Sequence, residues 1–111
     1  MGSGDLSVKD IQFCGTSLDD IRAFPKDVIH EVGYQLHRVQ SGMEPTNWKP
    51  INTVGPGVIE IRIREDSGAF RVFYVANRGN TVAVLHAFRK TTQKTEKRDI
   101  DLAKARFKQL E

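Results

Sequence analysis

Side chains that suit the binding of a phosphate and a flat ring recur along successive predicted strands. They are Glu60, Arg62, Arg71, His86 and Phe88. A guanidinium group donates parallel hydrogen bonds to a phosphate, and an aromatic ring stacks on a base. These residue types therefore suit an anionic ligand that carries a base. The alternative interpretation is a solvated sheet face with ion pairs, a hydrogen-bonded structural histidine and a core phenylalanine.

The hydrophobic pattern predicts how the first pair of strands aligns. If residues 65–68 form a hairpin loop, Arg62 lies opposite Arg71, and the isoleucines at 59, 61 and 63 face apolar partners. A slip of one residue would turn Arg71 toward the core, and we reject that register.

The next hairpin extends the row to a further strand. A turn at 78–79 places Arg71 opposite His86 and pairs Val72 with Leu85 in the core. The prediction is a row on the sheet face away from the helices, formed by Arg62, Arg71 and His86, with Glu60 and Phe88 beside it. Directly opposed arginines repel, so either Glu60 or a bound anion is expected between them.

Cations continue this floor beyond the last strand. Arg89, Lys90 and Lys94 follow Phe88, and the segment 89–108 holds eight Lys or Arg against three acids. The usual interpretation of such a run is a solvated linker and helix face. Beside an arginine row, the run also suits the rim of a nucleic-acid site.

These side chains need a sheet and helices to position them. Periodicity predicts a short edge strand at 8–13, a capped helix at 17–24, a helix from Pro25 to about 41, and a loop at 43–57. It then predicts strands at 58–64, 70–76 and 81–88 and a last helix at 95–110, capped by Thr95. The expected fold is α+β, with an antiparallel twisted sheet of about four strands, helices on one sheet face and a C-terminal helix. We expect a flexible tail at 1–6 and a single domain at 7–111.

The composition of the chain limits the class of protein and its location. Hydrophobic residues make up 39% of the chain, charged residues 28%, and the formal net charge is +3. Cys14 is the sole cysteine, which excludes an internal disulfide and favours a reducing, cytoplasmic location. No apolar run is long enough to span a bilayer, so no membrane partner is expected.

His30 and His37 lie about 10.5 Å apart along one predicted helix, too far to share a metal. We expect no metal and no cofactor.

Short motifs along the chain, in this order, resemble a known family. They include Ser17-Leu18-Asp19-Asp20, Phe24-Pro25, Gly33-Tyr34-Gln35-Leu36, Trp48-Lys49-Pro50, Glu60-Ile61-Arg62, Arg71-Val72-Phe73-Tyr74, and His86-Ala87-Phe88 with Lys90 to Thr95. From about Val8 to Leu110 the chain resembles the phage-derived, HigB-like branch of the RelE/ParE toxins of bacterial type II toxin–antitoxin systems. One departure is Thr91, which stands where many members carry a second lysine.

The resemblance implies a RelE-like fold and a toxin that a cognate antitoxin neutralises. In this branch the antitoxin is commonly a helix-turn-helix DNA-binding protein. The implied activity is metal-independent cleavage of mRNA, usually on the ribosome. Two other classes stay open: a ParE-like inhibitor of DNA gyrase without catalysis, and a non-toxic homologue that binds RNA or its partner.

The implied chemistry gives the candidate residues roles. Arg71 and Arg62 would bind the scissile phosphate, and His86 would transfer protons because its reference pKa is about 6.5. Glu60 is the alternative base, or it orients Arg62. Phe88 would stack on a base. The remaining cations would hold the RNA backbone; they are Lys49, Arg89, Lys90 and Lys94.

Overall fold

A computed structural model describes residues 8–110, apart from the side chains at 77 and 78. The predicted tail at 1–6 lies outside these residues. In chain order the elements are β1 (Asp10–Phe13), α1 (Ser17–Arg22), α2 (Lys26–Gln40), β2 (Trp48–Pro50), β3 (Val58–Glu65), β4 (Gly68–Arg78), β5 (Thr81–Lys90) and α3 (Lys97–Gln109). The α+β class is confirmed.

The strands form a mixed sheet in the order β1-β5-β4-β3-β2. Neighbouring strands are antiparallel except β1, which runs parallel to β5. The predicted strand count of about four is wrong because β2 lies within the predicted loop at 43–57. Its three residues pair with Ile59–Ile61 of β3, and such a short edge strand containing Pro50 leaves little periodicity to detect.

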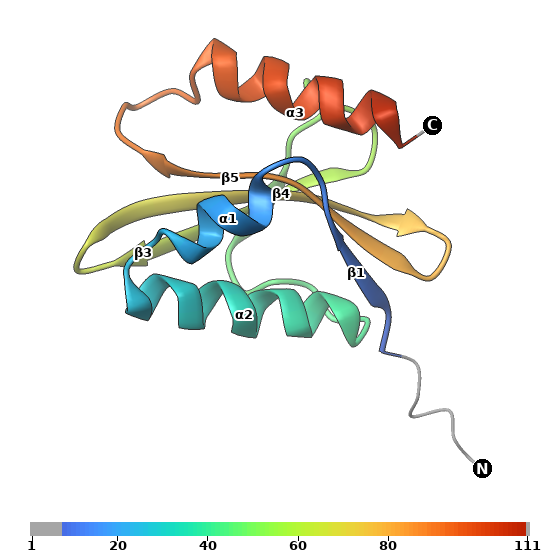
Figure 1. The fold of residues 1–111 in the computed structure, drawn as a ribbon, viewed down its shortest axis with the longest axis horizontal. Helices are drawn as coiled ribbons and strands as arrows, with labels where there is room; N and C mark the ends of the chain where they lie inside the picture. Colours follow the sequence, from blue (N-terminus) through green and yellow to red (C-terminus); the bar gives the residue numbers. More distant parts are fainter. Residues whose placement is uncertain (1–7, 111) are drawn as a thin grey trace.

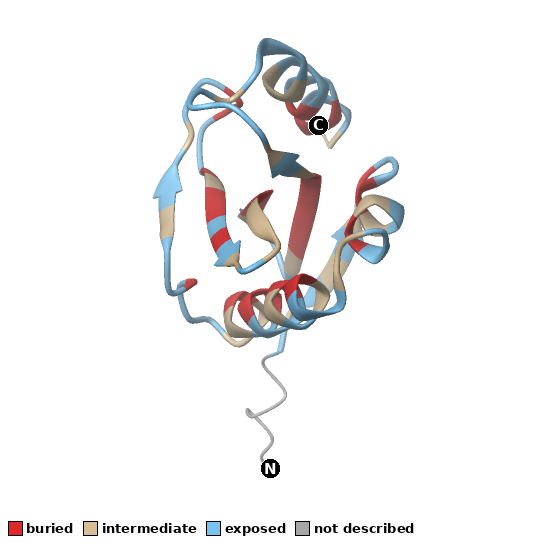
Figure 2. Ribbon diagram, turned by 90° about the vertical axis from the view of Figure 1, so that its left-hand side faces the viewer, coloured by how far each residue is buried: buried red, intermediate tan, exposed pale blue. Residues whose placement is uncertain are grey.

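Helices cover both faces of the sheet. Figure 1 shows α2 below the strands and α3 above them, and Figure 2 shows the strands between these helices from the side. α1 packs with α2, since Ile21 and Phe24 join the core on that face. The prediction of helices on one face only is wrong, because α3 carries its own apolar stripe to the opposite face.

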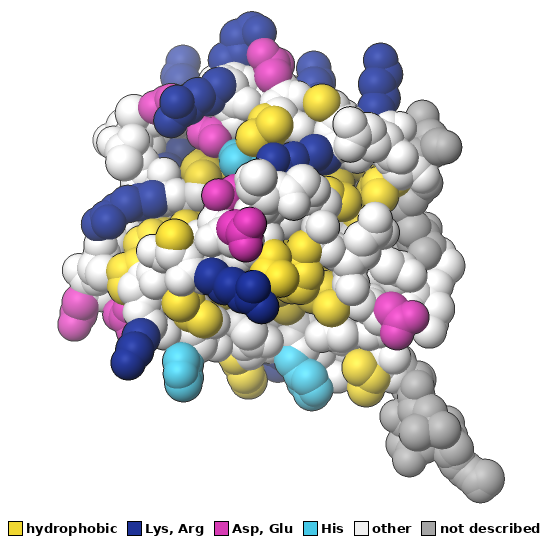
Figure 3. Space-filling view, in the orientation of Figure 1, with side chains coloured by type: hydrophobic (Ala, Val, Ile, Leu, Met, Phe, Trp, Pro, Cys, Tyr) yellow, Lys and Arg dark blue, Asp and Glu magenta, His cyan; other side chains and the backbone are white. Residues whose placement is uncertain are grey.

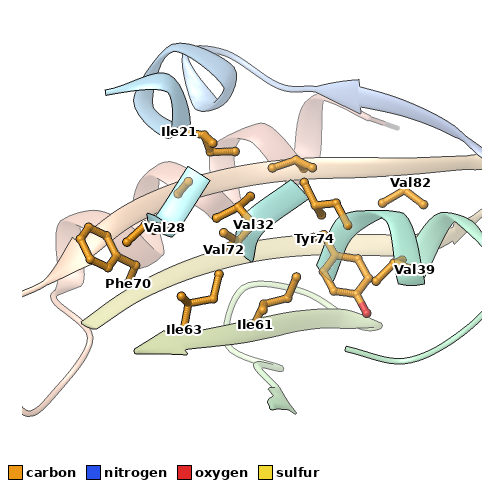
Figure 4. Packing of buried hydrophobic residues seen from close by; sticks show 13 residues of the cluster. Ile21, Val28, Val32, Val39, Ile61, Ile63, Phe70, Val72, Tyr74 and Val82 are labelled. Carbon is orange, nitrogen blue, oxygen red and sulfur yellow. The ribbon is translucent and has the colours of Figure 1, made fainter. Parts of the chain in front are cut away.

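The core under α2 follows the predicted pattern. Val28, Val32, Leu36 and Val39 form the buried stripe of α2. They meet alternate residues of the strands, as Figure 4 shows; these strand residues include Ile61, Ile63, Phe70, Val72 and Tyr74. Apolar residues spaced i, i+4 and i+8 on the helix therefore pack against alternate residues of the strands, because these spacings place side chains on one face of each element.

A second core lies between the sheet and α3. It is built on Phe73, Val75 and Leu85 from the strands and on Ala103 and Phe107 from α3. The loop before β3 closes this core tightly. A Cβ added to Gly55 would stand 2.6 Å from the Phe107 ring, so only glycine allows this approach.

The helix starts differ from the predicted caps. α1 begins after Thr16, and the Ser17 hydroxyl is buried and donates to the Val84 carbonyl at 3.3 Å. The residue before α3 is Glu96, not Thr95. α2 begins at Lys26, one residue later than predicted, and Pro25 is the extended residue before it.

Charged side chains are distributed unevenly over this scaffold. Figure 3 shows Lys and Arg side chains gathered along the α3 side of the molecule. Lys97 and Arg98 are almost fully exposed there. Across residues 8–110, no helix is long and apolar enough to cross a membrane.

Candidate functional site

The β3–β4 hairpin brings two arginines face to face. Arg62 pairs with Arg71, Ile61 with Val72 and Ile63 with Phe70, so the predicted register is confirmed. The strands continue to Glu65 and Gly68, which leaves Asp66 and Ser67 as the hairpin loop. Since the isoleucines point to the α2 core, both guanidinium groups emerge on the α3 side of the sheet.

A buried carboxylate lies among these cations. Glu60 is 1% exposed, and its oxygens lie 3.6 Å from Arg71 Nε, 3.8 Å from Arg62 Nε and 3.9 Å from Lys49 Nζ. These separations are ion-pair distances longer than hydrogen bonds. Glu60 therefore offsets the repulsion between the opposed arginines, and β2 contributes Lys49 to the same cluster.

Arg71 is the most buried cation of the cluster, at 8% exposure. Its Nη1 donates to the Phe70 carbonyl at 3.0 Å, whereas its buried Nε finds no hydrogen-bond acceptor within residues 8–110. Burial lowers the pKa of Arg71, partly opposed by the Glu60 carboxylate, and Arg62 and Arg64 lower it further. The chain thus holds a desolvated guanidinium with an unused donor.

The two arginines open into a groove of about 510 Å³, which we name the arginine groove. Its lining is cationic and polar: Arg62, Arg64, Ala69, Arg71, Lys90, Thr91, Thr92 and Gln93. The pKa of Lys90 is lowered by desolvation and by the neighbouring charges of Arg71, Lys49 and Arg62, partly opposed by Glu60. Desolvation is the larger cause of both pKa shifts, and the neighbouring like charges that add to it would be relieved by a bound anion.

The predicted pairing of Arg71 with His86 is wrong. Arg71 pairs with Phe88, and His86 pairs with Phe73, two residues away on β4. The turn falls at 79–80, where Gly79 has a φ of 66°, and the ladder shifts between Phe73 and Tyr74. Leu85 is the extra residue at that bulge, so it faces the α3 core and does not pair with Val72.

His86 lies apart from the arginine groove, beneath the start of α3. It is 5% exposed, and its Nε2 lies 2.8 Å from Asp99 Oδ1. Its Nδ1 is buried without a hydrogen-bond partner in the described part of the chain. The expectation of an open, helix-free floor around this imidazole is wrong, because α3 covers it.

Phe88 joins the two regions. Its ring stacks on His86 at 5.0 Å between centroids and meets Phe73 edge-on at 5.3 Å. The ring is half-buried, so the core interpretation accounts for part of its surface. On β5, Phe88 therefore lies between Arg71, which pairs with it from β4, and His86, on which its ring stacks.

The other predicted rim residues divide between two grooves. Arg89 points to the α2 side, where its guanidinium lies over the Phe70 ring and donates to the Ser67 carbonyl. Arg89 and Lys94 line a groove of about 250 Å³ under the segment that follows β5, which we name the loop groove. Its lining residues are Phe88, Arg89, Lys90, Thr91, Thr92, Lys94, Glu96, Arg98 and Asp99. Only Lys90 is a rim cation of both grooves.

A third groove, the α1/α3 groove, receives His86. Its lining residues are Asp20, Ala23, Phe24, His86, Ala87, Phe88, Arg98, Asp99 and Leu102.

Two residues of the grooves, Arg64 and Asp99, were not predicted from the sequence. The strict alternation of β3 places Arg64 beside Arg62, so that signal was present. Asp99 carries no such signal, since its contact with His86 depends on where α3 docks.

No group of three or more His, Cys, Asp or Glu residues within residues 8–110 is arranged to hold a metal ion. His30, Tyr34 and His37 are exposed on α2, as predicted. They are separate from the grooves around Arg71.

The model of the family described as phage derived protein Gp49-like (DUF891) matches residues 19–108, so the chain belongs to that family. The Gp49-like family belongs to the RelE/HigB-like toxin superfamily, which confirms the sequence resemblance at that level. Family membership is consistent with the toxin component of a toxin–antitoxin system and implies a cognate antitoxin. No curated protein matches the chain.

Proposed function

We propose that this chain is a HigB-like toxin of a type II toxin–antitoxin system, acting in the cytoplasm as a metal-independent, ribosome-dependent mRNA endoribonuclease. Residues 7–111 act as a single toxin domain, and a helix-turn-helix antitoxin neutralises it. The observation that carries the proposal is the buried Arg71 opposite Arg62 in a cationic groove. Glu60 offsets the repulsion between the arginines, but the burial of Arg71 and Glu60 still costs desolvation, and a site for an anion accounts for that cost.

The arginine groove suits the scissile phosphate. Arg71 lines this groove, and Arg62 and Lys90 carry exposed or half-exposed cations beside it. A phosphate here would accept charge-assisted hydrogen bonds from both guanidinium groups, the stronger class of hydrogen bond. Negative charge that grows on the phosphate in the transition state would be stabilised by these guanidinium groups once Arg62 has turned toward it.

Glu60 is better placed than His86 to take the proton of the 2′-hydroxyl. Glu60 lies among the cations of the groove, whereas His86 is engaged by Asp99 and stacked under Phe88. Glu60 Oε1 has no hydrogen-bond partner among the described side chains. Arg62, whose side chain is 40% exposed, must turn toward the phosphate to open that oxygen. His86 then acts indirectly, by holding Asp99 and Phe88 in place.

Transcript cleavage by purified variants on ribosomes tests the proposal. Arg71→Ala should lower the cleavage rate about 10²–10³-fold, the loss typical of a removed transition-state donor. Arg38→Ala is a matched control, because Arg38 bonds the Glu44 carbonyl on the far side of the sheet. Equal rates for wild type and a folded Arg71→Ala variant would refute the site. Toxicity with intact transcripts and blocked DNA replication would point instead to gyrase inhibition.

A further inference from the structure

The α1/α3 groove combines apolar walls with a carboxylate, a pairing that the arginine groove lacks. Its volume is about 600 Å³, within the range of about 300–1,000 Å³ that small-ligand sites occupy. Phe24, Phe88 and Leu102 supply apolar surface, and Leu102 is 40% exposed. Flat aromatic ligands fit such walls because stacking needs only a ring face.

The three grooves follow one another along the surface. The arginine groove and the loop groove share Lys90, Thr91 and Thr92. The loop groove and the α1/α3 groove share Phe88, Arg98 and Asp99. A nucleotide strand whose phosphate occupies the arginine groove can therefore continue past the cations of the loop into the α1/α3 groove.

Charge decides which part of a nucleotide the α1/α3 groove accepts. Asp20 and Asp99 line it together with one cation, Arg98, and the two carboxylates outweigh that cation, repel a phosphate and accept N–H donors from a base. Asp99 Oδ1 is held by His86 Nε2 at 2.8 Å, which leaves Oδ2 as the oxygen that His86 does not engage. His86 is 5% exposed, so this contact is a fixed one and orients the carboxylate.

We propose that the α1/α3 groove binds a base of the RNA strand held in the arginine groove, and that Asp99 selects bases carrying an exocyclic amino group. Phe88 contacts the base, Asp99 accepts from its amino group, and His86 is a positioning residue for Asp99. Adenine, cytosine and guanine satisfy this requirement, whereas uracil has no such amino group. The inference rests on the proposed function and adds its base preference.

Cytidine and uridine monophosphates are the closest pair of probes: position 4 carries an amino donor in cytosine and a carbonyl acceptor in uracil, and N3 changes with it from an acceptor to an N–H donor. Binding to the full chain is followed by the NMR signal of the Leu102 methyl groups. We expect the cytidine nucleotide to bind about tenfold more tightly, because one hydrogen bond to a charged group changes the affinity by about that factor. Asp99→Asn should abolish or invert this preference, because its amide oxygen still accepts from His86 while its NH2 group donates to the uracil carbonyl and not to an amino group.

Asp101→Asn is the charge-matched control. Asp101 lies on the same helix, is exposed and pairs with Lys97, away from the groove. It should leave the tenfold preference unchanged, and equal losses in both aspartate variants would overturn the proposal. Leu102→Ala keeps the Asp99–His86 contact and should weaken both nucleotides alike, followed by isothermal calorimetry.

The binding measurement needs no cleavage, so its outcome is separate from that of the proposed function. If Arg71-dependent cleavage occurs but both nucleotides bind equally, the base site is wrong and the nuclease stands. If transcripts remain intact but the cytidine preference disappears in Asp99→Asn, the base site stands and the nuclease is wrong. If neither nucleotide shifts the Leu102 signal and the cognate antitoxin does, the groove is a protein interface and the proposal is overturned.

Discussion

Replacing Glu60 by glutamine removes the only carboxylate that lies among Arg62, Arg71 and Lys49 in the described structure. Glutamine keeps the shape of the side chain, so packing is conserved while the charge is lost. Arg71, at 8% exposure, would then be a buried cation opposite another arginine. The variant therefore isolates the electrostatic role of Glu60.

The expected loss follows from the geometry of the Glu60–Arg71 pair. At 3.6 Å, an effective dielectric constant of about 20 gives a gross attraction of about 4–5 kcal/mol. Removing one partner of a buried ion pair costs about 3–5 kcal/mol in practice. Because the contact is longer than a hydrogen bond and Arg71 keeps its bond to the Phe70 carbonyl, we expect about 3 kcal/mol, the lower end of that range.

Urea unfolding measures this loss as a shift in midpoint at constant slope. Glu65→Gln is the matched control, since Glu65 ends the same strand and forms no ion pair within residues 8–110. Glu60→Gln combined with Arg71→Met should recover part of the stability, because no buried cation is left unpaired. A Glu60→Gln variant within about 0.5 kcal/mol of wild type would refute the reasoning, since that is the scatter of neutral surface substitutions.

Further predictions concern pH and packing. The pKa of Lys90 is lowered by desolvation and by the charges of Arg71, Lys49 and Arg62. RNA affinity, measured by filter binding, should therefore fall as alkaline pH neutralises this amine. Lys90→Arg should abolish the fall, and an identical fall in that variant would contradict the assignment. Burial raises the pKa of Tyr74 to about 12, with a further rise from Glu44. In a Tyr34→Phe background, the absorbance of the Tyr74 phenolate should therefore appear only near that pH. The stability that depends on the neutral phenol should be lost between about pH 10, the reference tyrosine pKa, and about pH 12. Ionisation near pH 10 in the folded chain would contradict this. Gly33 lies inside α2 with nothing within 4 Å of an added Cβ; Gly33→Ala should stabilise the fold by about 0.5–1 kcal/mol in thermal unfolding, and a lower melting temperature would show that the position is constrained.

The hydrophobic pattern of the chain was enough to specify the β3–β4 register and the buried stripe of α2. In β3, Ile59, Ile61 and Ile63 alternate with polar residues, so a slip of one position would bury charge, and only one register satisfies the pattern. The opposition of Arg62 and Arg71 follows directly from it. The single-sided apolar periodicity of α2 was equally specific.

The alignment of β5 and the surroundings of His86 depend on contacts between elements that are distant in sequence. β5 is buried on both faces, so a shift of its ladder costs little in hydrophobic pattern, and the bulge at Leu85 left no sequence signal. The docking of α3 then brought Asp99 to His86, thirteen residues away. Local pattern determines which face of an element is apolar; which partner covers that face is set by packing between elements that are distant in sequence.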